Sequence, residues 1–380
     1  MKSRILVYGV DHFMGALTSR AAMRARLGHV AAGRNIAPVA QHAVALAREA
    51  KADAGGALAE PRTFTLGDAA RIGSQLDDVS VVVNCAPLDG GDLATLMRAC
   101  MATGTHYIDL AADRAHVAAL VAEDEAAQKA KVMLMAGAGF DFAAADAVAA
   151  RLAYILPGAR AVTLAVKRSA LTQAEARALV AALRETGETV KNGQFVTARA
   201  GERTLEIDFD KGPETAWLAP WRGEAMAARH RGGYSTVESY EVLPEKAAKA
   251  LEPGTFANRL FRRGWGLKGL ERKLSGGRLT PSAAELKNGR AIVWGEARTP
   301  DGQVRRARLE TTSPHLYSAE AAVLLARRAA QGGAKPGFQL PSAIGAAALV
   351  EEIEGCVWRE IVDVETSGET DALSALPASA

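Results

Sequence analysis

A glycine-rich turn near the start of the chain carries the pattern most specific for a chemical role. Gly9 follows the short apolar run 4–8, and Gly15 opens a segment whose apolar residues recur at helical spacing. A second apolar run, 29–32, then ends at Gly33. Strand, glycine turn, helix and strand within about 30 residues form the first unit of a dinucleotide-binding fold, whose turn holds a pyrophosphate. The chemistry this predicts is hydride transfer by a bound nicotinamide cofactor.

Arg34 and Asn35 follow the second strand, where such folds distinguish the two nicotinamide dinucleotides. An enzyme for NAD carries Asp or Glu near this position, and the carboxylate binds the ribose hydroxyls. Arginine instead suits a 2′-phosphate, because its planar guanidinium matches phosphate oxygens. The residue type therefore predicts NADP as the cofactor.

The residues between the two glycines depart from the usual pattern. His12 stands where a middle glycine normally lets the backbone approach the pyrophosphate, and Asp11 adds a negative charge beside it. Either His12 is a functional substitution at the floor of the cofactor pocket, or the turn no longer binds a nucleotide. In the second case the protein is a non-redox scaffold or binding module on the same fold.

Composition and charge exclude several classes of function. The 380 residues are 49% hydrophobic, which predicts a large core and two domains, and the net charge of +3 gives no support for nucleic-acid binding. The three cysteines and seven histidines show no metal-binding spacing and no disulfide framework. No signal-peptide pattern is present, and no apolar run approaches the roughly 20 residues of a membrane helix. We expect a soluble cytoplasmic protein.

The elements that must position these residues divide the chain at about Asp146. Before it, apolar strand-like runs alternate with helical segments, which predicts an N-terminal Rossmann domain, residues 1–146, with a doubly wound parallel sheet. A ligand should then lie at the carboxyl ends of the strands. These ends carry Gly9, Gly33, Arg34, Asn84, Cys85, Ala86, Pro87, Asp109, Gly137, Ala138 and Gly139.

The remainder predicts a second α+β domain, residues 147–336, with a mixed or antiparallel sheet. Strand-like runs occur at 161–168, 204–209, 235–243, 291–297 and 304–311. The last two flank a hairpin turn at 299–302, and an exposed edge at 304–311 would suit a homodimer. Residues 337–365 are expected to form a C-terminal helix that packs back on the Rossmann domain, and 366–380 a disordered tail.

Several motifs, taken in order, resemble a known family. They are AGRN at 32–35, VVVNCAPLDGGDLATLMRACMATGTHYIDLAAD at 81–113, GAGFDFAAAD at 137–146, STVESY at 235–240, AELKNGRAIVWGEARTPDGQ at 284–303 and GFQLPSAIGA at 337–346. This set is similar to the saccharopine-dehydrogenase-like NADP-binding oxidoreductases, and to their bacterial branch of trans-acting enoyl reductases. The resemblance implies a hydrophobic, lipid-like substrate. Where the family usually reads GATGYTG, this chain has Gly9-Val-Asp-His-Phe-Met-Gly15.

The candidate site follows from the turn and from the strand ends. The residues expected to bind NADP are Gly9, Val10, Asp11, His12, Phe13, Met14, Gly15, Arg34, Asn35, Asn84, Cys85, Ala86, Pro87, Asp109 and Gly137. The residues expected to be catalytic are Asp141, Tyr107 and His12. Asp141 could instead cap a nearby helix, and Asp109 could brace its own loop. Tyr234, Tyr240, His315 and Tyr317 are further proton-donor candidates, each also explained by packing.

The leading hypothesis is an NADP-dependent oxidoreductase that reduces a C=C or C=O bond of a hydrophobic small molecule. The scaffold is one alternative. A reductase of an amino-acid-derived imine is another, and it would need cations such as Arg168 or Arg222 at the cleft for a substrate carboxylate. The basic amphipathic segment 256–274 is either an ordinary surface helix or a weak contact with an anionic membrane.

Overall fold

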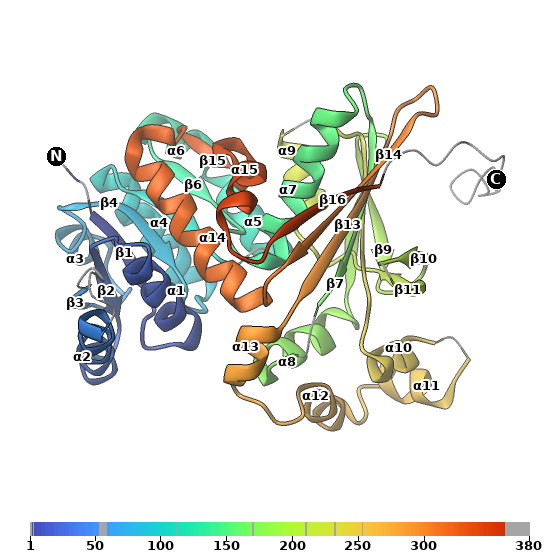
Figure 1. The fold of residues 1–380 in the computed structure, drawn as a ribbon, viewed down its shortest axis with the longest axis horizontal. Helices are drawn as coiled ribbons and strands as arrows, with labels where there is room; N and C mark the ends of the chain where they lie inside the picture. Colours follow the sequence, from blue (N-terminus) through green and yellow to red (C-terminus); the bar gives the residue numbers. More distant parts are fainter. Residues whose placement is uncertain are drawn as a thin grey trace.

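The chain folds into two sheets that lie side by side, with helix α7 (Phe140–Ile155) between them (Figure 1). The computed structural model describes residues 2, 4–52, 59–111, 113–168, 171–209, 211–231, 233–252 and 254–361. The tail predicted at 366–380 lies outside these residues.

Among the described residues, the first sheet has seven strands, all parallel, in the order β15-β6-β5-β4-β1-β2-β3. Its central strands are buried on both faces, as their apolar runs predict. The predicted Rossmann-type sheet is therefore confirmed. The strands are β1 (Arg4–Tyr8), β2 (His29–Gly33), β3 (Ala59–Thr63), β4 (Val79–Asn84), β5 (His106–Asp109), β6 (Met133–Met135) and β15 (Gly337–Gln339).

Helices connect these strands and pack beside the sheet. They are α1 (Phe13–Arg24), α2 (Ile36–Ala52), α3 (Ala69–Ser74), α4 (Gly90–Thr103), α5 (Arg114–Ala122) and α6 (Asp124–Ala130). A late helix, α14 (Pro314–Arg328), returns from the second sheet and contacts α1. In Figure 1 its orange ribbon crosses the Rossmann part of the molecule.

The C-terminal segment differs from the predicted single helix. The strand β15 extends the first sheet beside β6, and three short helical pieces follow: η2 (Pro341–Ile344), α15 (Ala346–Leu349) and η3 (Val350–Glu352). Pro341 and Gly345 interrupt the helical pattern, which explains the pieces. The last described strand, β16 (Val357–Ile361), pairs with the second sheet instead. The Rossmann sheet is thus completed by residues from both ends of the chain.

The second sheet is mixed, as predicted, and has nine strands in the part of the chain that the structure describes. Its main path runs β10-β11-β12-β7-β13-β14-β16, with β8 paired to β12 and β9 to β8. The predicted exposed edge at 304–311 is wrong, because β14 lies between β13 and β16. The strands are β7 (Ala161–Lys167), β8 (Thr186–Lys191), β9 (Gln194–Arg199), β10 (Thr204–Asp208), β11 (Pro213–Leu218), β12 (Thr236–Glu241), β13 (Ala291–Arg298) and β14 (Val304–Thr311).

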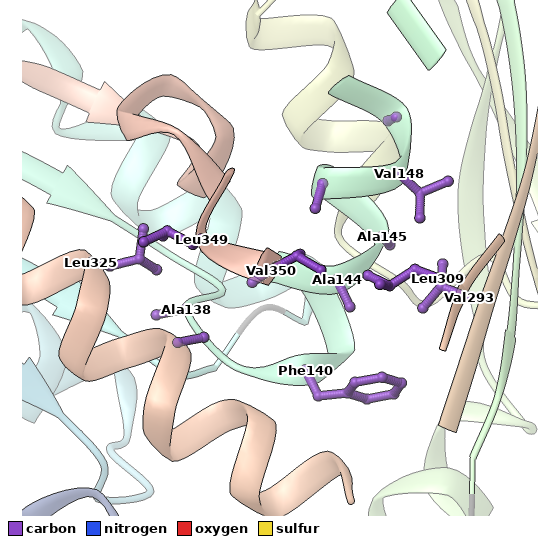
Figure 2. Close-up of a cluster of buried hydrophobic side chains, with 14 of the residues drawn as sticks. Ala138, Phe140, Ala144, Ala145, Val148, Val293, Leu309, Leu325, Leu349 and Val350 are labelled. Carbon is purple, nitrogen blue, oxygen red and sulfur yellow. The ribbon is translucent and has the colours of Figure 1, made fainter. Parts of the chain in front are cut away.

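Helix α7 supplies the core that joins the two sheets. Its residues Ala144, Ala145 and Val148 are buried between α14 and α15 on one side and β13 and β14 on the other (Figure 2). Gly295 of β13 allows this close contact, since a Cβ there would stand 2.5 Å from a methyl carbon of Val148. One hydrophobic cluster therefore runs continuously from the Rossmann sheet to the second sheet.

The basic segment forms two helices, α11 (Phe256–Arg262) and α12 (Leu267–Ser275), at the edge of the second domain (Figure 1). Leu267, Leu270 and Leu274 pack on a cluster centred on α8 (Gln173–Ala182). The apolar side of α12 is therefore used in intramolecular packing, as expected of an ordinary surface helix. The remaining helices here are α9 (Glu224–Arg231), α10 (Glu245–Leu251) and α13 (Ala283–Asn288).

Candidate active site

The glycine-rich turn has the backbone shape that a dinucleotide requires. Gly9 has φ +93°, a conformation side chains rarely adopt, and a Cβ there would lie 2.8 Å from the amide nitrogen of Ala86. A Cβ on Gly15 would lie 2.0 Å from the carbonyl oxygen of Gly9. The two glycines therefore fix how closely α1 approaches β1 and the end of β4.

His12 does not disturb this turn. It is the N-cap residue of α1 with an extended backbone, φ −114° and ψ 158°, which any residue adopts. Its side chain is exposed and makes no capping hydrogen bond, so the start of α1 keeps amide groups directed toward a ligand. The shape of this turn fits a dinucleotide pyrophosphate.

At the carboxyl end of β2, three charged side chains gather. Asp11 accepts hydrogen bonds from the backbone amide of Arg34 and the side-chain amide of Asn35, both at 3.3 Å. The guanidinium of Arg34 pairs with Asp92 in the first turn of α4 at 2.8 Å. Gly33 leaves room for this arrangement, since a Cβ there would lie 2.6 Å from Asp11 Oδ1.

A buried hydrogen-bond network braces the ends of β4 and β5. Asp109 accepts hydrogen bonds from Asn84, Tyr107 and the amide of Ala111, and it is 1% exposed. Burial raises the pKa of the Asp109 carboxyl, although the hydrogen bond from Tyr107 opposes this. Burial also holds the pKa of Tyr107 well above its ordinary value, with the Asp109 charge adding to the effect. Tyr107 therefore has a bracing position inside the domain, away from the cavity described below.

The other predicted cofactor residues lie at the same edge of the sheet. Cys85 and Ala86 follow β4, and Asn84 binds both the amide and the carbonyl of Ala86. Burial raises the pKa of the Cys85 thiol to about 12, so this thiol is not an activated nucleophile. Gly137 follows β6 with φ +75°, and a Cβ there would meet the ring of Phe142. Pro87 continues the loop into α4.

A cavity of about 470 Å³ opens between the Rossmann edge and the second sheet. The loop after β5 and the start of α5 line one side of it, and α8 lines another with small and apolar side chains. The apolar residues that line the cavity from α8 and from the segment just before it are Leu171, Ala178, Leu179, Ala181 and Ala182. Trp221 completes the wall.

The wall opposite α8 carries paired charges. Arg168 directly follows β7 and Glu241 ends β12, and because these strands are parallel neighbours the two side chains meet, 3.0 Å apart. Arg168 also binds the carboxylate of Asp141. Burial alone would lower the pKa of Arg168, but Asp141 and Glu241 raise it. Asp141 is the second residue of α7, whose N-cap is Gly139, so its predicted capping role is wrong.

Arg222 extends this charged wall from the loop after β11. Its guanidinium donates to Glu224 at 2.8 Å and to the backbone carbonyl of Asp141, and it lies 3.6 Å from Glu241. Arg222, Glu224 and Glu241 are each less than 8% exposed. Glu224 Oε2 has no hydrogen-bond partner among the described residues. Arg168, Arg222, Asp141 and Glu241 thus line one end of the cavity, and Glu224, which does not line it, is the ion-pair partner of Arg222.

A second pair links the cavity to the glycine turn. Glu175 of α8 lines the cavity and lies 3.1 Å from His315, whose ring packs edge-on against Phe13 at the start of α1. Burial opposes ionisation of Glu175, yet hydrogen bonds from His315 and Thr172 bring its pKa down to about 2. Tyr234, Tyr240 and Tyr317, the other donor candidates, are buried in the protein and do not line this cavity.

The sequence predicts Asp141 as a catalytic candidate and Arg168 and Arg222 as possible cleft cations, and the structure places all three in the lining of this cavity. Sequence reasoning did not single out Glu175, Glu224 or Glu241. One sequence feature could have identified Glu241 as a site residue: it is a carboxylate at the end of an otherwise largely apolar, strand-like run. The sequence around Glu175 indicates a structural role instead, because Thr172 and Glu175 form a capping box that explains the glutamate without any ligand.

The described part of the chain contains no group of three His, Cys, Asp or Glu residues suited to a metal ion. Within the same residues, none of the helices combines the length and apolar character required to span a bilayer.

Residues 24–135 match the family model of the saccharopine dehydrogenase NADP binding domain. Among solved structures, the chain is similar to apo saccharopine dehydrogenase (L-Glu forming) from Saccharomyces cerevisiae, with a TM-score of 0.61 and 14% identity, over 94% of this chain and 100% of that one. A meso-DAP dehydrogenase mutant from Clostridium tetani E88 matches with a TM-score of 0.44 and 15% identity, over 90% and 96%. A search of curated proteins found no match.

The chain therefore has the fold seen in that saccharopine dehydrogenase structure, and residues 24–135 are similar to the family's NADP binding domain. These matches do not single out the trans-acting enoyl reductase branch.

Proposed function

We propose that the protein is an NAD(P)-dependent oxidoreductase whose substrate is an amino-acid-derived molecule held by charged groups in the cavity. The observation that carries this proposal is the charged wall of Arg168, Arg222, Asp141 and Glu241, of which Asp141 is exposed and the other three side chains are largely buried. This wall lies where ligands of open parallel sheets bind, outside the carboxyl ends of the strands.

The residues present fit a dinucleotide. Gly9 and Gly15 shape the turn, the uncapped start of α1 would face the pyrophosphate, and the ends of β4 and β5 would border the nicotinamide. When bound, the cofactor would supply or accept the hydride. The chain itself would bind and orient the substrate and exclude water from it.

The charges of the wall suit a molecule that carries both signs. A guanidinium binds a carboxylate through two parallel hydrogen bonds, and the carboxylates of Asp141 and Glu241 accept from an ammonium or iminium group. Among all the residues that line the cavity, anionic side chains outnumber cationic ones, so a purely anionic substrate is disfavoured. The anionic residues are Asp113, Asp141, Glu175, Glu185 and Glu241, and the cationic ones are Arg114, Arg168 and Arg222. A C=N bond next to a carboxylate, as in an imine of an amino acid, satisfies both halves of the wall.

Reduction of a C=C or C=O bond in a hydrophobic substrate, with NADP as cofactor, is the second candidate. The small apolar side chains of α8 favour it, because they leave space for an apolar part of the substrate. The charges of the opposite wall argue against a substrate that is apolar throughout, since such a substrate would take water away from them and offer them no hydrogen-bond partner.

The first experiment is titration calorimetry of the full chain with NADPH, NADH and adenosine diphosphate. We expect at least one dinucleotide to bind more tightly than adenosine diphosphate. If neither binds, the oxidoreductase proposal fails, and the non-redox scaffold becomes the better account.

The second experiment follows oxidation of the reduced cofactor with two panels: mixtures of amino acids with oxo acids, and apolar enones and ketones. The variant Arg168→Met should raise KM for the imine panel at least tenfold. Arg177→Met is the matched control, because Arg177 is an exposed residue of α8 that does not line the cavity. Turnover of the apolar panel alone, unaffected by Arg168→Met, would favour the second candidate.

A further inference from the structure

The adenosine end of the cofactor site contains a carboxylate that comes from an unexpected element. In NAD-binding sheets, the acid that binds the ribose hydroxyls follows the second strand. Here β2 ends in Gly33, and Arg34 follows. Asp11, from the glycine turn, fills the space that Gly33 leaves, and the amides of Arg34 and Asn35 hold its carboxylate at the end of β2.

We propose that Asp11 binds the adenosine ribose hydroxyls and that, together with Asp92, it makes the site select NAD(H) over NADP(H). This inference rests on the proposed function. A carboxylate is an acceptor only, so it pairs with ribose hydroxyls and repels a 2′-phosphate. Its position at the end of β2 is the one from which the usual acid acts.

Arg34 alone would favour the 2′-phosphate, but its guanidinium is already paired. Asp92 lies 2.8 Å from Arg34 Nη2, and its side chain is 24% exposed, which limits screening by water. The site therefore holds one cation, Arg34, and two carboxylates, Asp92 on its guanidinium and Asp11 on its backbone amide, so the local charge is negative before any phosphate arrives. An arriving 2′-phosphate has to displace Asp92 from Arg34 and lie near Asp11 as well.

The test measures Kd for NADH and NADPH by calorimetry in the wild type and in three variants. We expect the wild type to bind NADH more tightly. Asp92→Asn frees Arg34 and should shift the Kd ratio toward NADPH on the order of tenfold. Asp11→Asn should weaken NADH and strengthen NADPH, because the amide keeps an acceptor for Arg34 but removes the charge.

The matched control is Asp77→Asn. Asp77 is exposed on the same domain and precedes β4, so it lies at the amino end of that strand, whereas the site lies at the carboxyl ends of the strands. The substitution therefore removes one negative charge without touching the site. This variant should leave the Kd ratio unchanged. Thermal unfolding of each variant identifies any that fail to fold. If either Asp11→Asn or Asp92→Asn fails to fold, the remaining one of these two variants decides the test.

Each outcome has one meaning. Tighter NADPH than NADH binding by the wild type overturns the selectivity proposal while the oxidoreductase proposal stands. An unchanged ratio in folded Asp11→Asn and Asp92→Asn proteins also overturns it. Absence of binding by both dinucleotides overturns both proposals.

Discussion

Arg222 offers the most direct test of how the charged wall is held together. We predict that Arg222→Met lowers the free energy of unfolding by about 3–5 kcal/mol, the usual cost of leaving a buried charge without its partner. Glu224 is 5% exposed and Arg222 is its ion-pair partner in the described structure, with the nearest N–O distance 2.6 Å. Glu241 keeps Arg168, so most of the loss falls on Glu224.

A second substitution separates the charge from the packing. Arg222→Met combined with Glu224→Gln removes the unpaired charge and should recover about 1–3 kcal/mol of the loss. The assay is equilibrium urea unfolding, followed by both circular dichroism and tryptophan fluorescence. Coincident transitions are required before a single free energy is assigned.

The pH dependence of the difference supplies an independent check. In Arg222→Met, the freed Glu224 is buried without a cation, so its folded pKa should exceed its unfolded value. A folded protein with the higher carboxyl pKa binds more protons and gains stability as the pH falls. The gap between variant and wild type should therefore shrink from pH 8 to pH 5. A loss below about 1 kcal/mol, or no recovery in the double variant, would refute the reasoning.

Three further predictions concern the Rossmann domain. Gly15→Ala should cost about 1–3 kcal/mol and abolish dinucleotide binding, because its Cβ would lie 2.0 Å from a backbone oxygen, whereas Gly28→Ala, with nothing within 4 Å, should do neither. His42 has a pKa lowered by burial from 6.5 to about 4, so stability is full above pH 6.5 and should fall by about 2 kcal/mol by pH 5. Urea unfolding of His42→Gln should show a shallower pH slope, and an equal slope would contradict this. His12→Gly should change the Kd for a dinucleotide by less than about threefold, because His12 is exposed and has an extended backbone. A large gain in dinucleotide affinity would instead favour the hypothesis that the natural turn no longer binds a nucleotide.

The parallel sheet was predictable because most of its strands can be recognised from their own local sequence. Buried parallel strands are continuous apolar runs, and β4 (VSVVVN) is a clear example. The strand β15 was missed for the opposite reason. Its three residues, Gly337–Gln339, carry too little apolar pattern, and only their pairing with β6, some 200 residues earlier, makes them a strand.

The charged wall shows the same limit for the site. Arg168, Arg222 and Glu241 belong to three separate elements, and no spacing in the sequence relates them. Arg168 and Glu241 meet only because β7 and β12 are parallel neighbours, which no local pattern of either strand reveals. The turn at 9–15 was recognisable because all of its parts are consecutive. A constellation assembled by topology needs the fold first.

The return of the chain to the first sheet has a consequence for biosynthesis. Because β15 is an edge strand of the Rossmann sheet and α14 covers α1, that domain is still incomplete when the ribosome has finished β6. Folding during translation must leave an unpaired β6 edge exposed while the whole second domain emerges. Nascent chains arrested before Gly337 should therefore be substrates for chaperones, and chains arrested well after Gln339 should not.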